Sequence, residues 1–141
     1  MSEVAYHDSV TVEWGDCDEA GIVFYPNYFY WFDCGFQRLL RGRGLSQRIL
    51  RERFGAVTPI LRAEADFVAP ARYDDVLAIV AHVEQWEARR FRVTYTLSHD
   101  DRPVARGFET RAWATVMPDG RLKGAAIAAE FRSLLESQGI G

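Results

Sequence analysis

A strongly aromatic segment, residues 27–41, constrains the fold of this chain more than any other feature. Its apolar side chains occupy nearly the whole circumference of a helix, which is the pattern of a helix buried on most sides. They are Tyr28, Phe29, Trp31, Phe32, Phe36, Leu39 and Leu40. Gly42 and Gly44 are expected to end the helix. A chain with such a helix needs a second element that is wide enough to surround it.

Strand patterns on both sides of the helix supply that second element. The predicted strands cover roughly residues 8–14, 57–69, 76–86, 89–99 and 104–117. Turn residues at 100–103 and 118–121 separate the later strands. Strands joined by hairpins pair antiparallel, so one face of the resulting sheet can wrap the helix. The sequence therefore predicts an α+β fold.

Two shorter helices and the chain length complete the outline. An amphipathic helix is expected around residues 46–53, and residues 125–136 predict a C-terminal helix. The sequence has 141 residues, 48% of them hydrophobic, which is enough for one substantial core. It contains no repeat, linker or low-complexity segment. We therefore expect a single domain over residues 1–141.

Composition and charge narrow the functional classes. The formal net charge is −3 and the basic residues are dispersed, so we expect no nucleic-acid partner. No apolar run approaches the roughly 20 residues that cross a membrane, and the first residues lack a signal-peptide pattern. A cytoplasmic protein without a membrane partner is therefore expected. Cys17 and Cys34 should stay reduced there, and no histidine lies at metal-ligand spacing from them. We expect neither a metal nor a cofactor.

The residues just before the aromatic helix are the ones best suited to chemistry. Asp16 and Asp18 lie two residues apart in a predicted loop, Gly21 follows, and Tyr25-Pro26-Asn27 resembles a helix start. A carboxylate at this place can act as a base or a nucleophile, and free backbone N–H groups can polarise a carbonyl oxygen. A loop aspartate can also simply cap a turn, and this alternative stays open for both carboxylates.

The same stretch resembles the hotdog-fold acyl-CoA thioesterases of the 4-hydroxybenzoyl-CoA thioesterase type. The matching residues are Gly-Asp-Cys-Asp-x-Ala-Gly-Ile-Val-x-Tyr-Pro-Asn-Tyr at residues 15–28, Asp33, Thr58-Pro59-Ile60, Tyr73-Asp74-Asp75-Val76-Leu77 and Glu84-x-Trp86. The resemblance covers nearly the whole chain. It implies the hotdog fold, in which an antiparallel sheet wraps a long helix. It also implies active sites built between two protomers, so a homodimer or a homotetramer is expected.

The resemblance further implies the reaction and the residues that perform it. The implied activity is hydrolysis of an acyl-CoA, with a hydroxybenzoyl or other aromatic acyl group favoured. The implied site residues are Asp18 and Tyr25 for catalysis, Asp33 and Thr58 near the acyl group, and Trp86, Arg89 and Arg90 near the nucleotide end of coenzyme A. The segment after Trp86 departs from the family because Glu87-Ala88 precedes the arginines, so the residues that bind the phosphates stay open.

Several alternatives remain at this stage. Asp18 could attack the thioester directly or activate water, and a short or medium aliphatic acyl group is the second candidate substrate. Asp33 has to pair with an arginine across an interface or line the pocket, because an unpaired buried carboxylate is costly. A hotdog hydratase would use an aspartate–histidine pair, and no histidine lies near the helix start. A non-catalytic acyl-CoA-binding protein would take up the thioester without releasing thiol.

Overall fold

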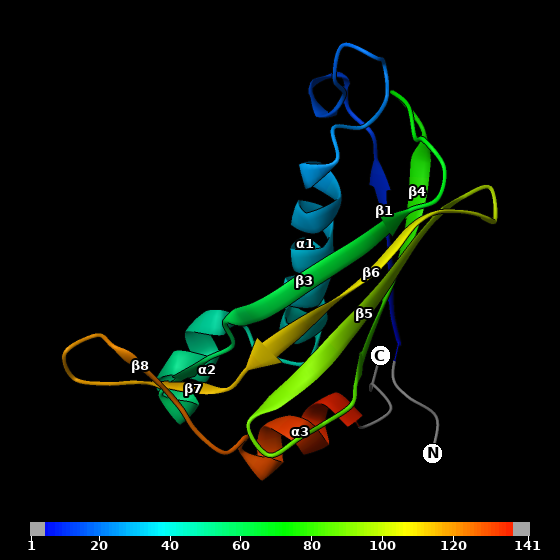
Figure 1. Ribbon diagram of the computed structural model, residues 1–141. Helices are drawn as coiled ribbons and strands as arrows, with labels where there is room; N and C mark the ends of the chain where they lie inside the picture. The colour runs from blue at the N-terminus through cyan, green and yellow to red at the C-terminus, as the bar shows by residue number, and fades with distance from the viewer. Residues whose placement is uncertain (1–4, 137–141) are drawn as a thin grey trace.

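The computed structural model describes residues 5–136, and Figure 1 shows its elements in chain order. The helices are α1 (Pro26–Gly42), α2 (Gln47–Phe54) and α3 (Ala129–Glu136), and a 3-10 turn covers Trp14–Asp16. The strands are β1 (Ala5–Thr11), β2 (Ala56–Val57), β3 (Ile60–Phe67), β4 (Val76–Glu84), β5 (Arg90–His99), β6 (Arg102–Ala112), β7 (Ala114–Val116) and β8 (Leu122–Gly124). Within the described part of the chain, no helix combines the length and the apolar character of a membrane span.

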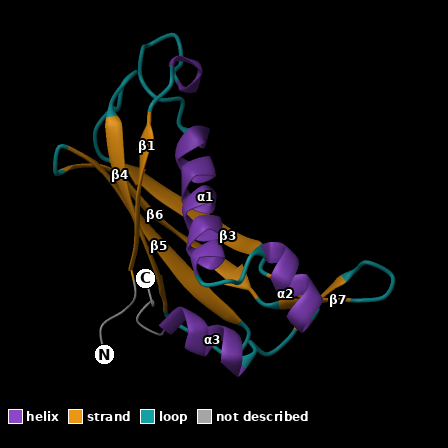
Figure 2. Cartoon of the chain, turned by 180° about the vertical axis from the view of Figure 1, so that it is seen from behind, coloured by secondary structure: helices purple, strands orange, loops and turns teal. Residues whose placement is uncertain are grey.

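The main sheet has the strand order β1-β4-β5-β6-β3, with antiparallel pairing throughout. Helix α1 lies along one face of this sheet, as the two opposite views show (Figure 1 and Figure 2). The predicted hotdog fold is therefore confirmed. The smaller sheet β2-β7-β8 lies with α2 and α3 at one end of α1, and the loop that precedes α1 lies at the other end.

The contact between α1 and the sheet depends on aromatic stacking and on one glycine. Phe32 of α1 stacks on Tyr95 of β5 with ring centroids 4.7 Å apart and planes 5° apart. Gly107 of β6 is the register partner of both Tyr95 and Ala65. A Cβ atom at Gly107 would lie 2.7 Å from Phe32 Cε2 and closer still to the Glu64 carbonyl oxygen. The glycine thus lets the aromatic helix approach the sheet closely.

The boundaries of α1 follow from its flanking residues. Pro26 occupies the first helical position, where its missing N–H costs nothing, and Tyr25 is the N-cap residue. At the other end, Gly44 adopts a φ of +71°, and its N–H donates to the Arg41 carbonyl. The predicted helix at 27–41 is therefore confirmed to within one residue at each end. The predicted helix at 46–53 corresponds to α2, in which Ser46 Oγ caps the Ile49 N–H.

Other predicted boundaries were wrong in detail, for local reasons. The strand expected over 8–14 ends at Thr11, because Glu13 and Asp16 form a capping box around a 3-10 turn. The strand expected over 57–69 is divided into β2 and β3 at Pro59, and the strand at 104–117 is divided at Trp113. Strand β8 was not predicted. Helix α3 begins at Ala129, four residues later than expected. Residues 1–4, part of the segment examined for a signal peptide, lie outside the described residues.

Strand β3 forms an edge of the main sheet and is exposed over almost its full length. Ile60, Leu61 and Phe67 expose 45%, 55% and 50% of their surface, respectively. An exposed edge with apolar side chains is a template for pairing with another strand. This edge extends from the α2 end of the molecule to the loop that precedes α1 (Figure 1).

Candidate active site

The loop that carries Asp18 is a tight hairpin held by its own backbone. The Asp18 N–H donates to the Ile22 carbonyl at 2.9 Å, and the Gly21 N–H donates to the Asp18 carbonyl at 2.9 Å. The Ala20 N–H donates to Asp18 Oδ1 at 2.9 Å, which orients the carboxylate. Gly21 has a φ of +82°, which the turn requires and which a glycine adopts without strain. Asp18 is exposed, so its carboxylate is both oriented and accessible.

Asp16 connects this loop to the start of α1. Its carbonyl accepts hydrogen bonds from the Phe24 N–H at 2.9 Å and from Asn27 Nδ2 at 2.8 Å. Its carboxylate accepts one from the Glu13 N–H at 2.8 Å. The hydrogen bonds of Asp16 are thus used to hold the backbone, whereas the Asp18 carboxylate has an accessible surface. The structure therefore gives the two aspartates different tasks.

The start of α1 offers one backbone donor, at Tyr25. The N–H groups of Asn27 and Tyr28 are bonded to the carbonyls of Phe24 and Tyr25, and Pro26 has no N–H. No acceptor among the described residues is bonded to the Tyr25 N–H. The sequence led us to expect several free backbone N–H groups at the helix start, whereas the structure leaves only the N–H of Tyr25 free among residues 25–28. A free N–H at a helix N-terminus is suited to polarise a carbonyl oxygen.

An apolar hollow of about 410 Å³ adjoins this donor. It lies between the loop, α1 and the end of β3, and its walls include Tyr25, Tyr28, Phe67 and Val68. Tyr25 is 58% exposed, and its ring meets the Phe67 ring edge to face, with centroids 5.9 Å apart. The hollow can accept a flat, apolar group beside the start of α1.

Asp33 and Thr58 belong to a second group of residues, which is organised by Arg111. Arg111 donates from Nη2 to Asp33 Oδ1 at 2.7 Å, from Nη1 to the Thr58 carbonyl at 2.9 Å, and from Nε to Glu109 Oε1 at 2.9 Å. Its guanidinium carbon lies 4.3 Å from the centre of the Phe36 ring. The arginine that pairs with Asp33 therefore comes from the same chain, not from across an interface.

The inner end of this group is fully buried. Glu109 and Arg111 are 1% and 3% exposed, and the Tyr95 hydroxyl donates to Glu109 Oε1 at 2.6 Å. Burial raises the pKa of Glu109, although the Arg111 charge and the Tyr95 hydrogen bond oppose that rise. Burial, followed by the charge of Glu109, raises the pKa of Tyr95 well above its usual value. Tyr95 therefore stays a hydrogen-bond donor in ordinary conditions.

The outer end of this group is partly open. The Asp33 side chain is 44% exposed, and Gln37 Nε2 donates to its Oδ1 at 3.1 Å. Gln47 bridges Gln37 Oε1 and Thr58 Oγ1 at 3.1 and 3.0 Å. Among the described residues, no hydrogen bond reaches Asp33 Oδ2. One carboxylate oxygen is therefore fixed and the other is available.

The three residues predicted to meet the nucleotide lie at the α2 and α3 end of the molecule. Trp86 is half-buried, with its ring 5.1 Å from Phe91 and 6.1 Å from Phe131 between centroids. Arg89 and Arg90 are exposed and line a hollow of about 360 Å³ next to the start of β3. Arg90 Nε lies 4.0 Å from Glu87 Oε1. Within one chain, the structure thus leaves this group far from the Asp18 loop (Figure 1).

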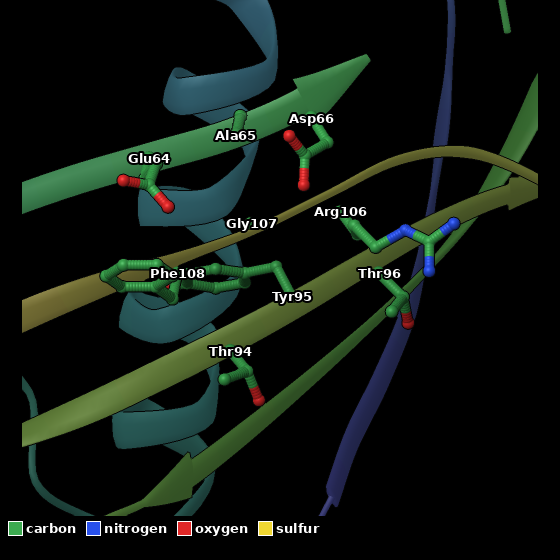
Figure 3. Close-up of a pocket in the computed structure, with 9 residues that line it drawn as sticks. All are labelled: Glu64, Ala65, Asp66, Thr94, Tyr95, Thr96, Arg106, Gly107 and Phe108. Carbon is green, nitrogen blue, oxygen red and sulfur yellow. The ribbon is translucent and has the colours of Figure 1, made fainter. Parts of the chain in front are cut away.

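A further hollow, of about 290 Å³, lies on the other face of the sheet. Figure 3 shows it over β3, β6 and β5, with α1 behind the strands. Thr94, Thr96 and Arg106 stand around it, and Gly107 forms part of its floor. This hollow includes no residue of the Asp18 loop, and the one residue that it shares with the Arg111 group is Tyr95, whose hydroxyl is bonded to Glu109. The hollow therefore does not belong to the candidate site.

Arg111 and Glu109 are the residues that sequence reasoning missed. They alternate with Gly107 on one face of the strand predicted over 104–117, and the apolar Ala105 and Trp113 lie on that same face. An acid and a base two residues apart on the apolar face of a strand indicate a buried ion pair. That signal is present in the sequence of this strand.

Comparison with known proteins identifies the relatives of this chain. The model of the thioesterase-like superfamily matches residues 12–119. The 4-hydroxybenzoyl-CoA thioesterase of Pseudomonas sp. (strain CBS-3) is 36% identical over 131 residues, which cover 87% of this chain and 92% of that protein. The 1,4-dihydroxy-2-naphthoyl-CoA hydrolase of Synechococcus elongatus is 30% identical over 101 residues, with 71% and 74% covered.

A solved structure agrees with these sequence relatives. A 4-hydroxybenzoyl CoA thioesterase, crystallised as an aspartate-to-asparagine mutant in complex with 4-hydroxybenzoyl CoA, superposes with a TM-score of 0.86. It is 32% identical, and the alignment covers 93% of this chain and 98% of that one.

Proposed function

We propose that this chain, which belongs to the thioesterase-like superfamily, is a hydrolase of hydroxylated aromatic acyl-CoA thioesters. The products are the free acid and coenzyme A. The observation that carries this proposal is that one loop and the helix start it leads into hold an exposed, oriented carboxylate at Asp18 and an unused N–H at Tyr25. The hotdog fold and the superfamily support the reaction class. The acyl group and the roles of individual residues are our inference.

The proposed chemistry needs only these two groups and water. Asp18 attacks the thioester carbonyl or activates the water that does so, and both routes stay open. The carbonyl oxygen gains negative charge in the transition state, and the Tyr25 N–H is our proposed donor that stabilises it. The thiolate of coenzyme A is a good leaving group, so no strong general acid is required. The solved relative with an aspartate replaced and the thioester bound is consistent with an essential carboxylate.

The choice of a hydroxylated ring rests on Asp33 and on the relatives. The names of two curated relatives both specify ring hydroxyl groups on the acyl moiety. A hydroxyl donor needs an acceptor, and Asp33 presents an accessible oxygen beside one that is already fixed. Sites that bond a substrate hydroxyl can reject the analogue without it by large factors. Asp33 is therefore our proposed hydrogen-bond acceptor for the ring hydroxyl, with Thr58 beside it.

Asp18 and Asp33 meet in this proposal through a homodimer. The free edge of β3 can pair with the same edge of a second copy about a two-fold axis. Antiparallel pairing would place the Phe67 end of one β3 beside the Ile60 end of the other. The Tyr25–Phe67 contact marks the first end, and Thr58, Arg89 and Arg90 adjoin the second. Two equivalent sites would result, each with Asp18 from one protomer and Asp33 from its partner.

In that dimer, Arg89 and Arg90 are our proposed ligands for the phosphates of coenzyme A. Both are exposed at the rim of the 360 Å³ hollow, and guanidinium groups bind phosphates through forked hydrogen bonds. Trp86 packs on Phe91 and Phe131, so its proposed contact with the nucleotide uses its remaining exposed edge. Assembly beyond a dimer and a cytoplasmic location stay predictions.

The first test is thiol release from a panel of acyl-CoAs, from acetyl to palmitoyl plus benzoyl and 4-hydroxybenzoyl. We expect 4-hydroxybenzoyl-CoA to be turned over fastest and D18N to lose about 1,000-fold in rate, or ~4 kcal/mol. The matched control is D16N in the same loop, which keeps an acceptor for the Glu13 N–H and should retain most activity. Faster turnover of aliphatic members would contradict the substrate, and an active D18N would contradict the mechanism.

The dimer has its own test. A lysine at Leu61 puts a charge on the free edge of β3 and should favour the monomer. We expect L61K to elute as a monomer in size-exclusion chromatography with light scattering, and to lose turnover because each site is then incomplete. The control is V76K on β4, since Val76 is equally exposed, at 53%, and lies away from β3. A dimeric, fully active L61K would contradict the shared site.

A further inference from the structure

Arg111 binds three different parts of the fold with its guanidinium group. Nε binds Glu109 on β6, Nη1 binds the Thr58 carbonyl between β2 and β3, and Nη2 binds Asp33 on α1. These partners lie 2, 53 and 78 residues away along the chain. One planar guanidinium therefore fixes the helix, the strand and the connecting segment relative to one another.

We propose that Arg111 is a positioning residue that sets the preference of this enzyme for a ring hydroxyl group, acting through Asp33. The inference rests on the proposed function, in which Asp33 accepts a hydrogen bond from the acyl ring. Arg111 itself lies beneath that carboxylate and is 3% exposed, so it is not placed to touch the substrate. Its contribution is the fixed orientation of the acceptor.

The geometry at Asp33 supports this role. Both hydrogen bonds to the carboxylate, from Arg111 and from Gln37, end on Oδ1. The carboxylate is thereby held through one oxygen, while Oδ2 keeps its lone pairs for a ligand. An acceptor that is already oriented loses little conformational entropy on binding, so more of the hydrogen-bond free energy appears as discrimination. A carboxylate rotating freely on an exposed helix would discriminate less.

The buried residues around Arg111 explain how its positive charge can orient Asp33 from inside the fold. The Arg111 cation would be costly to bury alone, and Glu109 neutralises it at 2.8 Å. Glu109 is itself held by the Tyr95 hydroxyl, and Tyr95 is stacked on Phe32 in the core. The chain from Tyr95 through Glu109 and Arg111 to Asp33 thus transfers the rigidity of the core to a half-exposed carboxylate.

The fork of arginine matters more than its charge in this arrangement. Lysine would keep the positive charge beside Glu109, but its single nitrogen cannot reach all three partners with the same geometry. R111K should therefore leave the fold intact while releasing Asp33. This makes R111K the informative variant, and R106K is its matched control, since Arg106 lies on the same strand but at the outer-face hollow of Figure 3.

The experiment compares kcat/KM for 4-hydroxybenzoyl-CoA with that for benzoyl-CoA in each protein. We expect the ratio to fall about tenfold or more in R111K, chiefly through the hydroxylated substrate, with benzoyl-CoA changed less than about threefold. R106K should match the wild type. A merely structural role for Arg111 would lower both rates together and leave the ratio unchanged, and that result would overturn the proposal.

A double-mutant cycle tests whether Arg111 acts through Asp33. D33N removes the acceptor charge and should itself lower the ratio. If Arg111 only positions Asp33, adding R111K to D33N should not lower the ratio further. Additive losses from the two substitutions would contradict the proposed route. Circular dichroism and the elution volume of each variant check that the fold and the assembly are retained.

The outcomes separate this inference from the proposed function. If the wild-type protein releases no thiol from either aromatic substrate, the proposed function fails and this inference falls with it. If thiol is released but the wild type has no preference for the hydroxylated ring, the proposed roles of Asp33 and Arg111 are overturned together, while the proposed thioester hydrolysis stands. A preference that collapses in R111K and in D33N, but not in R106K, supports both.

Discussion

Asp18 and Asp33 are two carboxylates held by opposite means. Asp18 sits in an exposed hairpin and is oriented by the N–H of Ala20, two residues away. Asp33 sits on a buried helix and is oriented by the side chain of Arg111, 78 residues away. The first arrangement is local and leaves the carboxylate accessible. The second is distant in sequence and extends to a fully buried acid.

Under the proposed function, this difference would let one small fold combine a reacting group with a selecting group. A group that reacts needs access and a precise approach, and a backbone hairpin supplies both without burying charge. A group that selects needs rigidity, and rigidity comes from the core. The two regions should therefore respond differently to substitution, and the following predictions measure that contrast from the largest effect to the smallest.

Removing the centre of the buried group should have the largest effect on stability. R111M leaves Glu109 and Asp33 without their counter-charge, and breaking a buried ion pair in this way costs about 3–5 kcal/mol. D18N keeps the acceptor for the Ala20 N–H and should change the free energy of unfolding by less than about 0.5 kcal/mol. Urea unfolding of both variants measures the contrast. Equal costs would contradict the view that only one of these regions is tied to the core.

Glycines in the two regions should differ in the same direction. G107A would force a Cβ atom against Phe32 and the β3 backbone, and we expect a loss of about 3 kcal/mol from overpacking. G21A meets no neighbouring atom and only suffers from the positive φ, at about 1 kcal/mol. Thermal and urea unfolding of the pair check this order. If G21A is the less stable of the two variants, the Asp18 loop would be more tightly constrained than the contact between α1 and the sheet, which would contradict our view.

The same contrast explains what the sequence could predict. The Asp18 hairpin and the start of α1 depend on neighbours within a few residues, so the motif at residues 15–28 and Pro26 were enough to place them. The long helix and the antiparallel strands followed from periodicity, which is a local property. Asp33 was recognised as needing a partner, since a carboxylate in an aromatic helix is costly. Its partner could not be chosen, because pairing with Arg111 depends on how β6 lies across α1.

The limits of prediction at the sheet have a physical cause as well. The breaks at Pro59 and Trp113 depend on the second sheet, which forms only when β2, β7 and β8 come together. Short strands carry too few residues for a period to appear. In the same way, the spatial separation between Asp18 and the pair Arg89 and Arg90 is a property of the folded chain. Because of this separation, one chain alone does not bring the two groups together, and pairing of two copies along the exposed edge of β3 is our proposed way to do so.

Tyr95 and Tyr25 allow the same comparison with a smaller expected effect on stability. Y95F deletes the hydroxyl that donates to Glu109 at 2.6 Å, and a lost hydrogen bond to a buried charged group should cost about 1.5–3 kcal/mol. Y25F removes a hydroxyl from a ring that is 58% exposed and should be neutral within about 0.5 kcal/mol. Because the proposed oxyanion donor is the Tyr25 backbone N–H, Y25F should also keep turnover within a few-fold. A large loss of rate in Y25F would assign the chemistry to the hydroxyl instead.

The smallest effect concerns the pH dependence of stability. Burial raises the pKa of Glu109 in the folded protein above its ordinary value of 4.5. The folded state therefore binds a proton more tightly than the unfolded state does, so this group contributes stability that is complete below pH 4.5 and is lost as the pH rises through the folded pKa. E109Q lacks this titration. The free energy of unfolding of the wild type minus that of E109Q should thus decline with rising pH across that window, by at most about 1.4 kcal/mol per pH unit.

Taking the difference between the two proteins cancels the carboxylates that they share, Asp18 among them. Urea unfolding at closely spaced pH values above and below 4.5 provides the measurement. A difference that rises with pH would mean that the Arg111 charge outweighs burial and lowers the pKa of Glu109. In that case the ion pair between Glu109 and Arg111 would stabilise the charged form of Glu109 by more than burial destabilises it. Asp33 would then be held by an arginine whose buried counter-charge on Glu109 persists to lower pH.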